Sequence, residues 1–116
     1  MEVNLNGIYT VIPKKKIKLD VMVGDAHPGF SQVYLNGKRL KRGSVIGDFE
    51  LGVGKDLIGK TLRIDTKVKV VNYDAYRTSV TNALRGGKQA EYFSAEKKAA
   101  KLGDTIIYHA SIKFVE

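Results

Sequence analysis

The sequence predicts an all-β protein: an antiparallel two-sheet β-sandwich of jelly-roll or immunoglobulin-like topology, with about seven or eight strands. Three observations favour this class. Short runs of alternating apolar and polar residues recur along the chain, which is the pattern of strands with one buried face. Turns rich in glycine separate these runs, and no long helical segments lie between them, as a parallel sheet would require. A closed β-barrel is the alternative that the same pattern allows.

The strongest alternation follows the glycine-bracketed segment 54–61 and continues to residue 72. Its apolar parity holds Leu62, Ile64, Val68 and Val70, and its charged parity holds Arg63, Asp65, Lys67 and Lys69. Residues 104–116 alternate over a similar length. Because these two segments have the most extensive alternation, we expect them to be the central pair of a sheet.

Shorter runs predict the remaining strands at 8–12, 16–23, 44–51, 78–84 and 88–93. Asn36-Gly37 suits the positive φ angles of a tight hairpin turn within residues 32–40, and Gly86-Gly87 marks a second hairpin. A two-residue loop there would set Arg85 opposite Lys88. Gly47 suggests a β-bulge. Phe30 ends a loop at 24–30, and we expect it to close one end of the core.

One short helix is predicted near residues 94–102. Ser94 can cap its N-terminus, Glu96 suits its first turn, Lys101 suits its last turn, and Gly103 follows its end. The segment amounts to about two helical turns.

Length and composition bound the other expectations. The 116 residues are enough for a single domain, 1–116. The chain has no cysteine, so it has neither a disulfide framework nor a zinc-finger pattern, and no apolar run approaches the ~18 residues of a membrane span. The N-terminus has no basic segment followed by an apolar one, so the default expectation is a cytoplasmic protein, with export as the open alternative. No motif in the sequence indicates a cofactor, and we expect none.

Residues 54–61 match the phosphate-loop pattern G-x-x-x-x-G-K-[ST] letter for letter. In a true phosphate loop a strand precedes the glycines, and a helix begins at the Lys-Thr pair so that its N-terminus faces the phosphates. Here Thr61 opens an alternating run rich in β-branched residues, which is typical of a strand. We therefore interpret the match as a turn leading into a strand and expect no nucleotide site.

A formal net charge of +8 favours an acidic partner such as nucleic acid or another polyanion. The basic residues are dispersed, so they form one surface only if the fold gathers them. The candidate polyanion-binding residues are Lys38 and Arg39 at the first hairpin and the outward row Arg63, Lys67 and Lys69. Exposed tyrosines beside such a row would supply rings for stacking.

Residues Tyr73, Tyr76 and Arg77 suggest a different use, because tyrosine and arginine in a loop often anchor a protein partner. Catalysis lacks a linear motif: Asp25 and His27 supply two metal ligands where three or four are needed, and His109 falls on the polar parity of the last strand. The leading expectation is a non-enzymatic interaction module that binds a protein, itself included, or forms part of a larger assembly. The alternative is binding of nucleic acid or another polyanion through a basic face.

Overall fold

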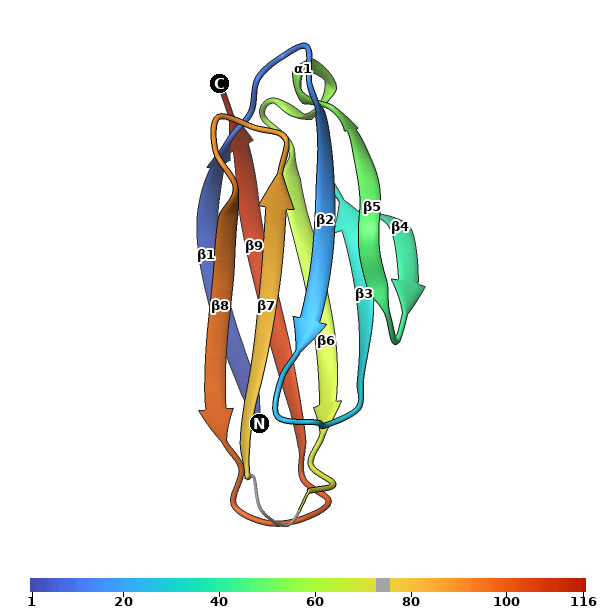
Figure 1. Ribbon diagram of the computed structural model, residues 1–116, viewed down its shortest axis with the longest axis vertical. Coiled ribbons are helices and arrows are strands. Elements are labelled where there is room, and N and C mark those ends of the chain that lie inside the picture. Colours follow the sequence, from blue (N-terminus) through green and yellow to red (C-terminus); the bar gives the residue numbers. More distant parts are fainter. Residues whose placement is uncertain (73–75) are drawn as a thin grey trace.

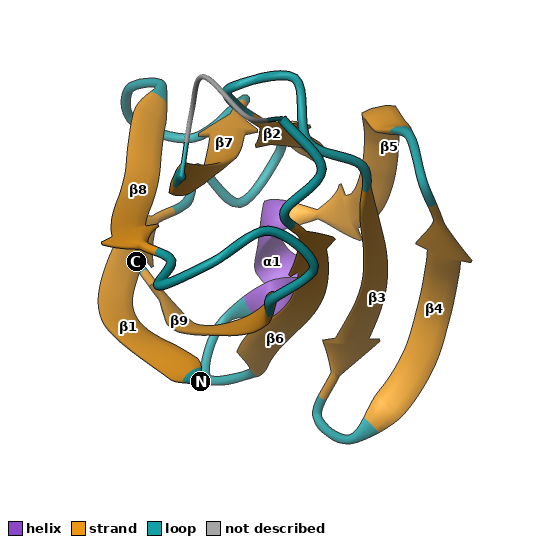
Figure 2. Ribbon diagram, turned by 90° about the horizontal axis from the view of Figure 1, so that it is seen from below, coloured by secondary structure: helices purple, strands orange, loops and turns teal. Residues whose placement is uncertain are grey.

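A computed structural model describes residues 1–72 and 76–116, which form nine strands and one short helix in two packed sheets (Figures 1 and 2). The five-stranded sheet has the order β1-β9-β6-β3-β4, formed by Glu2–Thr10, Thr105–Val115, Thr61–Lys69, Gly29–Leu35 and Lys38–Gly43. The four-stranded sheet has the order β5-β2-β7-β8, formed by Ile46–Val53, Lys16–Val23, Arg77–Arg85 and Glu91–Lys98. Each sheet keeps two edge strands, so the all-β sandwich is confirmed and the closed barrel is not.

The central pair of the larger sheet is the one expected from the alternation. β6 and β9 run antiparallel in continuous register from Thr61 opposite Lys113 to Lys69 opposite Thr105. The apolar parities of both strands are buried in the sandwich, and the polar parities face outward. One pair departs from the antiparallel expectation: β1 and β9 are parallel, with Glu2 opposite Ile107 and Thr10 opposite Val115.

The strand order allows a comparison with the two expected topologies. In an immunoglobulin-like sandwich, strands C, F and G are neighbours and strand B lies beside strand E. β3, β6 and β9 are neighbours here, and β2 lies beside β5, so these strands share the immunoglobulin-like relations. The β7–β8 hairpin occupies the other side of β2, where that fold places its first strand, so the topology as a whole differs from it.

The helix predicted near 94–102 is wrong. Residues Glu91–Lys98 are β8, which pairs with β7 from Leu84 opposite Glu91 to Arg77 opposite Lys98. Phe93 and Ala95 pack against the buried core from this strand. A two-turn helix gains little from its caps alone, whereas the ladder satisfies a whole row of backbone groups and partly buries one side of the strand. The helix that does form, α1, spans only Gly54–Leu57.

Both expected hairpins are present, with one difference in loop length. Asn36 and Gly37 have φ values of 48° and 84°, as the tight turn requires. The second hairpin has a longer loop, because the ladder between β7 and β8 ends at Leu84 and Glu91. Arg85 therefore does not face Lys88. It binds the carboxylates of Asp20 on β2 and Asp48 on β5 instead.

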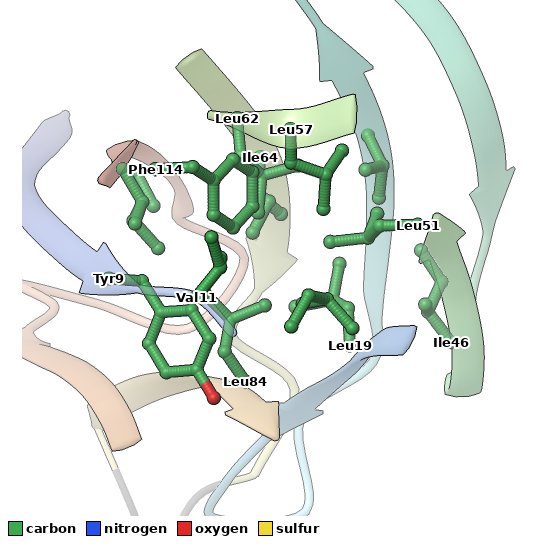
Figure 3. Close-up of a cluster of buried hydrophobic side chains, with 14 residues drawn as sticks. Tyr9, Val11, Leu19, Ile46, Leu51, Leu57, Leu62, Ile64, Leu84 and Phe114 are labelled. Atoms are coloured by element: carbon green, nitrogen blue, oxygen red, sulfur yellow. The ribbon is translucent and has the colours of Figure 1, made fainter. Parts of the chain in front are cut away.

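The main core lies between the sheets, where side chains of both sheets converge (Figure 3). Leu19 and Leu84 from the smaller sheet meet Leu62 and Phe114 from the larger one, all fully buried. Tyr9 is also buried, and its hydroxyl donates to the Gln89 carbonyl at 2.8 Å and accepts from Gly87 N at 2.9 Å. The β7–β8 loop is thereby held against the larger sheet.

Residues 54–61, which match the phosphate-loop pattern, have the opposite order of elements from a true phosphate loop. α1 precedes the Lys60-Thr61 pair, and Thr61 begins β6. The amide of Gly59 donates to Phe114 O at 2.9 Å, that of Lys60 to Leu57 O at 2.9 Å, and that of Thr61 to an Asn36 side-chain oxygen at 2.8 Å. These amides hold the turn against its neighbours and do not converge on an open anion site.

Candidate binding face on the five-stranded sheet

The register of the strands determines which side chains lie together on the outer surface of the five-stranded sheet. Because side chains opposite each other in a ladder lie on the same side, each row across the sheet can be followed from strand to strand. One row, from β1 to β4, reads Asn6, Ser111, Arg63, Tyr34 and Arg39. The next reads Asn4, His109, Asp65, Gln32 and Arg42, and the third reads Glu2, Ile107, Lys67 and Phe30.

We call this surface the basic face. Its cations are Arg39, Arg42, Arg63, Lys67, Lys69 and Lys113, and its carboxylates are Glu2 and Asp65. Six cations against two carboxylates leave an excess of four positive charges. Within the described part of the chain, neither Lys67 nor Lys69 has a carboxylate within 4.0 Å.

The two carboxylates of the basic face are already used by its own cations. Arg63 binds Asp65 through two nitrogens, Nε to Oδ1 and a terminal nitrogen to Oδ2, both at 3.0 Å. His109 Nδ1 lies 2.7 Å from the same Oδ1 atom, and His109 Nε2 lies 2.6 Å from Glu2 Oε1. The result is a continuous chain of polar contacts across β6, β9 and β1.

These contacts favour the charged form of the imidazole. The hydrogen bond with Asp65, and then the one with Glu2, raise the pKa of His109 above its ordinary value. As an imidazolium, His109 donates to both carboxylates at once. As a neutral ring it has one donor for two acceptors, so one contact must be lost.

A catalytic dyad is not formed at this position. Ser111 lies on the same face, but no hydrogen bond joins it to His109 in the described structure, and both imidazole nitrogens face carboxylates. A general base must be within hydrogen-bond reach of the proton that it takes. The arrangement is therefore suited to holding charge, and it leaves Ser111 without a base.

Phe30 does not close the core, which corrects the expectation. It belongs to β3, and its outward parity leaves the side chain 46% exposed opposite Lys67. Two depressions border it. One of about 500 Å³ is lined by Phe30, Gln32, Asp65, Lys67, Ile107 and His109, and one of about 310 Å³ by Pro28, Gly29, Phe30, Lys67, Lys69 and Thr105. Phe30 and Lys67 line both.

Four of the five candidate polyanion-binding residues meet on this face: Arg39, Arg63, Lys67 and Lys69. Lys38 does not, because it lies opposite Leu35, whose side chain packs toward the core. Sequence reasoning missed the contact between His109 and Asp65. The alternation of both strands places these residues outward, so the correct register of the central pair would have found it.

The candidate protein-binding residues are placed differently. Tyr73 lies outside the described residues. Tyr76 is partly buried and packs against the smaller core cluster, and its carbonyl accepts a hydrogen bond from Ala99 N at 2.7 Å. Arg77 begins β7 and forms an exposed ion pair with Glu96 at 3.8 Å. Tyr76 and Arg77 are therefore on the side of the four-stranded sheet and its end, away from the basic face.

The Asp25–His27 pair does not present an open imidazole. His27 is 5% exposed, and its Nδ1 accepts a hydrogen bond from Val71 N at 3.3 Å. Within residues 1–72 and 76–116, no group of three or more His, Asp or Glu side chains is arranged to hold a metal ion.

The outer surface of the four-stranded sheet has a different charge pattern, and we call it the charge-paired face. Its ion pairs are Lys16–Glu50 at 3.7 Å, Lys18–Asp48 at 3.4 Å, Arg77–Glu96 at 3.8 Å, and Arg85 with both Asp20 and Asp48. Beside these pairs lies a depression of about 470 Å³ whose rim includes the exposed side chains of Met22, Val45 and Tyr92.

Comparison with models of protein families, with curated proteins and with solved structures finds no match for this chain. Within the described residues, no helix has the length and apolar character needed to cross a membrane.

Proposed function

We propose that this protein is a non-enzymatic binding module that holds an anionic polymer against the basic face. The observation that carries the proposal is the excess of four positive charges on the outer side of a single sheet. A surface of one charge sign concentrates an oppositely charged polymer and accelerates its association. Release of counterions from the polymer supplies much of the free energy of such binding.

The arrangement of the cations supports a polymer over a small anion. Arg63, Lys67 and Lys69 lie on the outward side of β6, with Asp65 between the first two, and Arg39 and Arg42 lie on the edge strand β4, two strands away. Such rows provide many separate contacts along a chain of phosphates or sulfates. A single small anion would need several donors converging on one point, as in the amide nest of a phosphate loop.

The test is binding to heparin, a sulfated polymer without bases, measured by isothermal titration calorimetry across salt concentrations. We expect affinity to fall steeply with salt. The double variant Lys67→Gln/Lys69→Gln should reduce the slope of log affinity against log salt by roughly 1 to 2, because two contacts that release counterions are lost. The matched control is Lys16→Gln/Lys18→Gln on the charge-paired face, which removes the same net charge. Equal effects of the two variants, or absence of binding at low salt, would contradict the proposal.

A protein partner is the second candidate, and the charge-paired face favours it in the form of a second copy of this chain. Ion pairs neutralise most of this surface, so two copies can approach there without the repulsion expected between two basic faces. Exposed Met22, Val45 and Tyr92 supply apolar contacts. Sedimentation velocity in high salt should reveal a dimer that Tyr92→Ser abolishes, and a monomer at all concentrations would contradict it.

A further inference from the structure

The side chain of Phe30 is an unusual component of a charged surface. It is the second residue of β3, which lies one strand from the edge of the sheet, and Lys67 lies opposite it on β6. Its exposure of 46% leaves much of an aromatic ring in water in the free protein. A single exposed apolar residue is ordinary on a protein surface. This ring, however, borders two depressions that also contain charged side chains, Lys67 in both and Lys69 in the smaller one.

The groups around the ring match the parts of a nucleotide. Lys67 lines both depressions and Lys69 lines the smaller one, so a chain of phosphates passing Phe30 meets two ammonium groups on the same strand. The Gln32 side chain lines the larger depression. Its Oε1 atom accepts from the Tyr34 hydroxyl at 3.1 Å and from Arg39 at 3.4 Å, which directs its amide nitrogen to other acceptors.

The second aromatic ring of the face is already covered. Arg63 lies over Tyr34, with 5.9 Å between its guanidinium carbon and the ring centroid, and the Tyr34 hydroxyl is bonded to Gln32. Tyr34 and Arg63 therefore form a fixed polar and basic wall beside the site. Phe30 is the aromatic side chain of this face whose ring surface is open among the described residues.

We propose that the anionic polymer is single-stranded nucleic acid and that Phe30 stacks on one of its bases, an inference that rests on the proposed function of the basic face. Exposed aromatic rings on a flat sheet with lysines and arginines around them are a general means of binding unpaired bases, because every base offers a π-face. A duplex keeps its bases stacked internally, so the ring would have no partner there. A sulfated sugar or an acidic peptide has no aromatic base, so it gains no base stacking on the ring.

The test compares two ligands on one protein: a fluorescein-labelled oligothymidylate and labelled heparin, both followed by fluorescence anisotropy at low salt. Phe30→Leu keeps the apolar volume and removes the ring. We expect it to weaken oligothymidylate binding by roughly 5- to 100-fold, the usual effect of removing one stacking ring, and to change heparin binding by less than about 2-fold. The control Ile58→Ala removes an apolar side chain that is 38% exposed in the turn before β6, outside both proposed binding surfaces, and it should change neither.

The outcomes separate this inference from the proposed function. Unchanged oligothymidylate binding in Phe30→Leu, or an equal loss for both ligands, would overturn stacking and leave the salt-dependent basic face in place. Heparin binding without oligothymidylate binding would also overturn the inference alone. Absence of binding to either ligand would overturn both. Far-UV circular dichroism confirms that each variant is folded, and oligothymidylate binding by Phe30→Tyr, which restores a ring, provides the rescue.

Discussion

Both outer faces of the sandwich carry many charged side chains, but they differ in how those charges are balanced. On the charge-paired face each carboxylate has a cation within 4 Å, and Arg85 bridges two of them. On the basic face six cations share two carboxylates, and Lys67 and Lys69 have no described acidic partner. Mutual repulsion of unpaired cations disfavours the compact state, so we expect an anionic ligand to stabilise this face.

The largest expected effect comes from making the basic face electrically neutral, as the charge-paired face nearly is. Lys67→Glu/Lys69→Glu leaves four cations and four carboxylates on this surface. We expect heparin affinity at low salt to fall by roughly 100-fold, because two contacts are lost and two repulsions are gained. Lys16→Glu/Lys18→Glu on the charge-paired face has the same net charge and should lower the affinity by only a few-fold. A similar loss in both would show that net charge alone governs binding.

A smaller effect is expected from breaking a pair on the charge-paired face. Asp20 accepts a hydrogen bond from Asp48 N at 2.6 Å and binds Arg85, and Asp48 occupies a β-bulge with a φ of 51°. Asp20→Ala removes the acceptor of that exposed amide, and we expect it to lower the free energy of unfolding by about 1 kcal/mol in urea denaturation.

The matched variant on the basic face is Lys67→Ala. It removes an unpaired cation and should change the free energy of unfolding by less than about 0.5 kcal/mol. Destabilisation by Lys67→Ala that equals the effect of Asp20→Ala would contradict the contrast between the two faces, because it would mean that Lys67 contributes to folding as a paired residue does.

The smallest effect concerns pH. Because the pKa of His109 is raised in the folded state, its contribution to stability is fully present below its unfolded pKa of about 6.5 and is lost as the pH rises through the folded pKa. Urea denaturation between pH 6 and pH 9 should show a decline on the order of 1 kcal/mol or less, since the site is partly exposed. His109→Gln should remove this decline. A wild-type profile that is flat over this range would contradict the assignment.

The fold was predictable where one parity of a strand is strongly apolar. β6 and β9 carry that signal over most of their length, so their existence and their pairing follow from the sequence. β8 does not: Ser94, Glu96 and the alanines after them are good helix residues locally, and only pairing with β7 makes the segment a strand. β1 joins β9 from the far end of the chain, a long-range pairing that leaves no local pattern.

The charged residues of the candidate site were predictable from the sequence, but its aromatic residue, Phe30, was not. Arg63, Lys67 and Lys69 share a parity, which identifies their common face without any knowledge of topology. Arg39 joins them only because β4 pairs with β3, and β3 with β6. Phe30 was assigned to the core because large apolar residues are usually buried. In the structure β3 begins at Gly29, so Phe30 is its second residue. The parity of the strand then directs the Phe30 side chain outward, opposite Lys67.

The most direct test of the central claim is an NMR titration of the isotopically labelled protein with a short oligothymidylate at low salt. We expect amide and side-chain shifts to change along β3, β6 and β9, with the largest changes at Phe30, Lys67 and His109, while β2, β7 and β8 remain unperturbed. Shift changes concentrated on the charge-paired face, or spread evenly over all exposed lysines, would contradict the claim that the basic face is the binding surface.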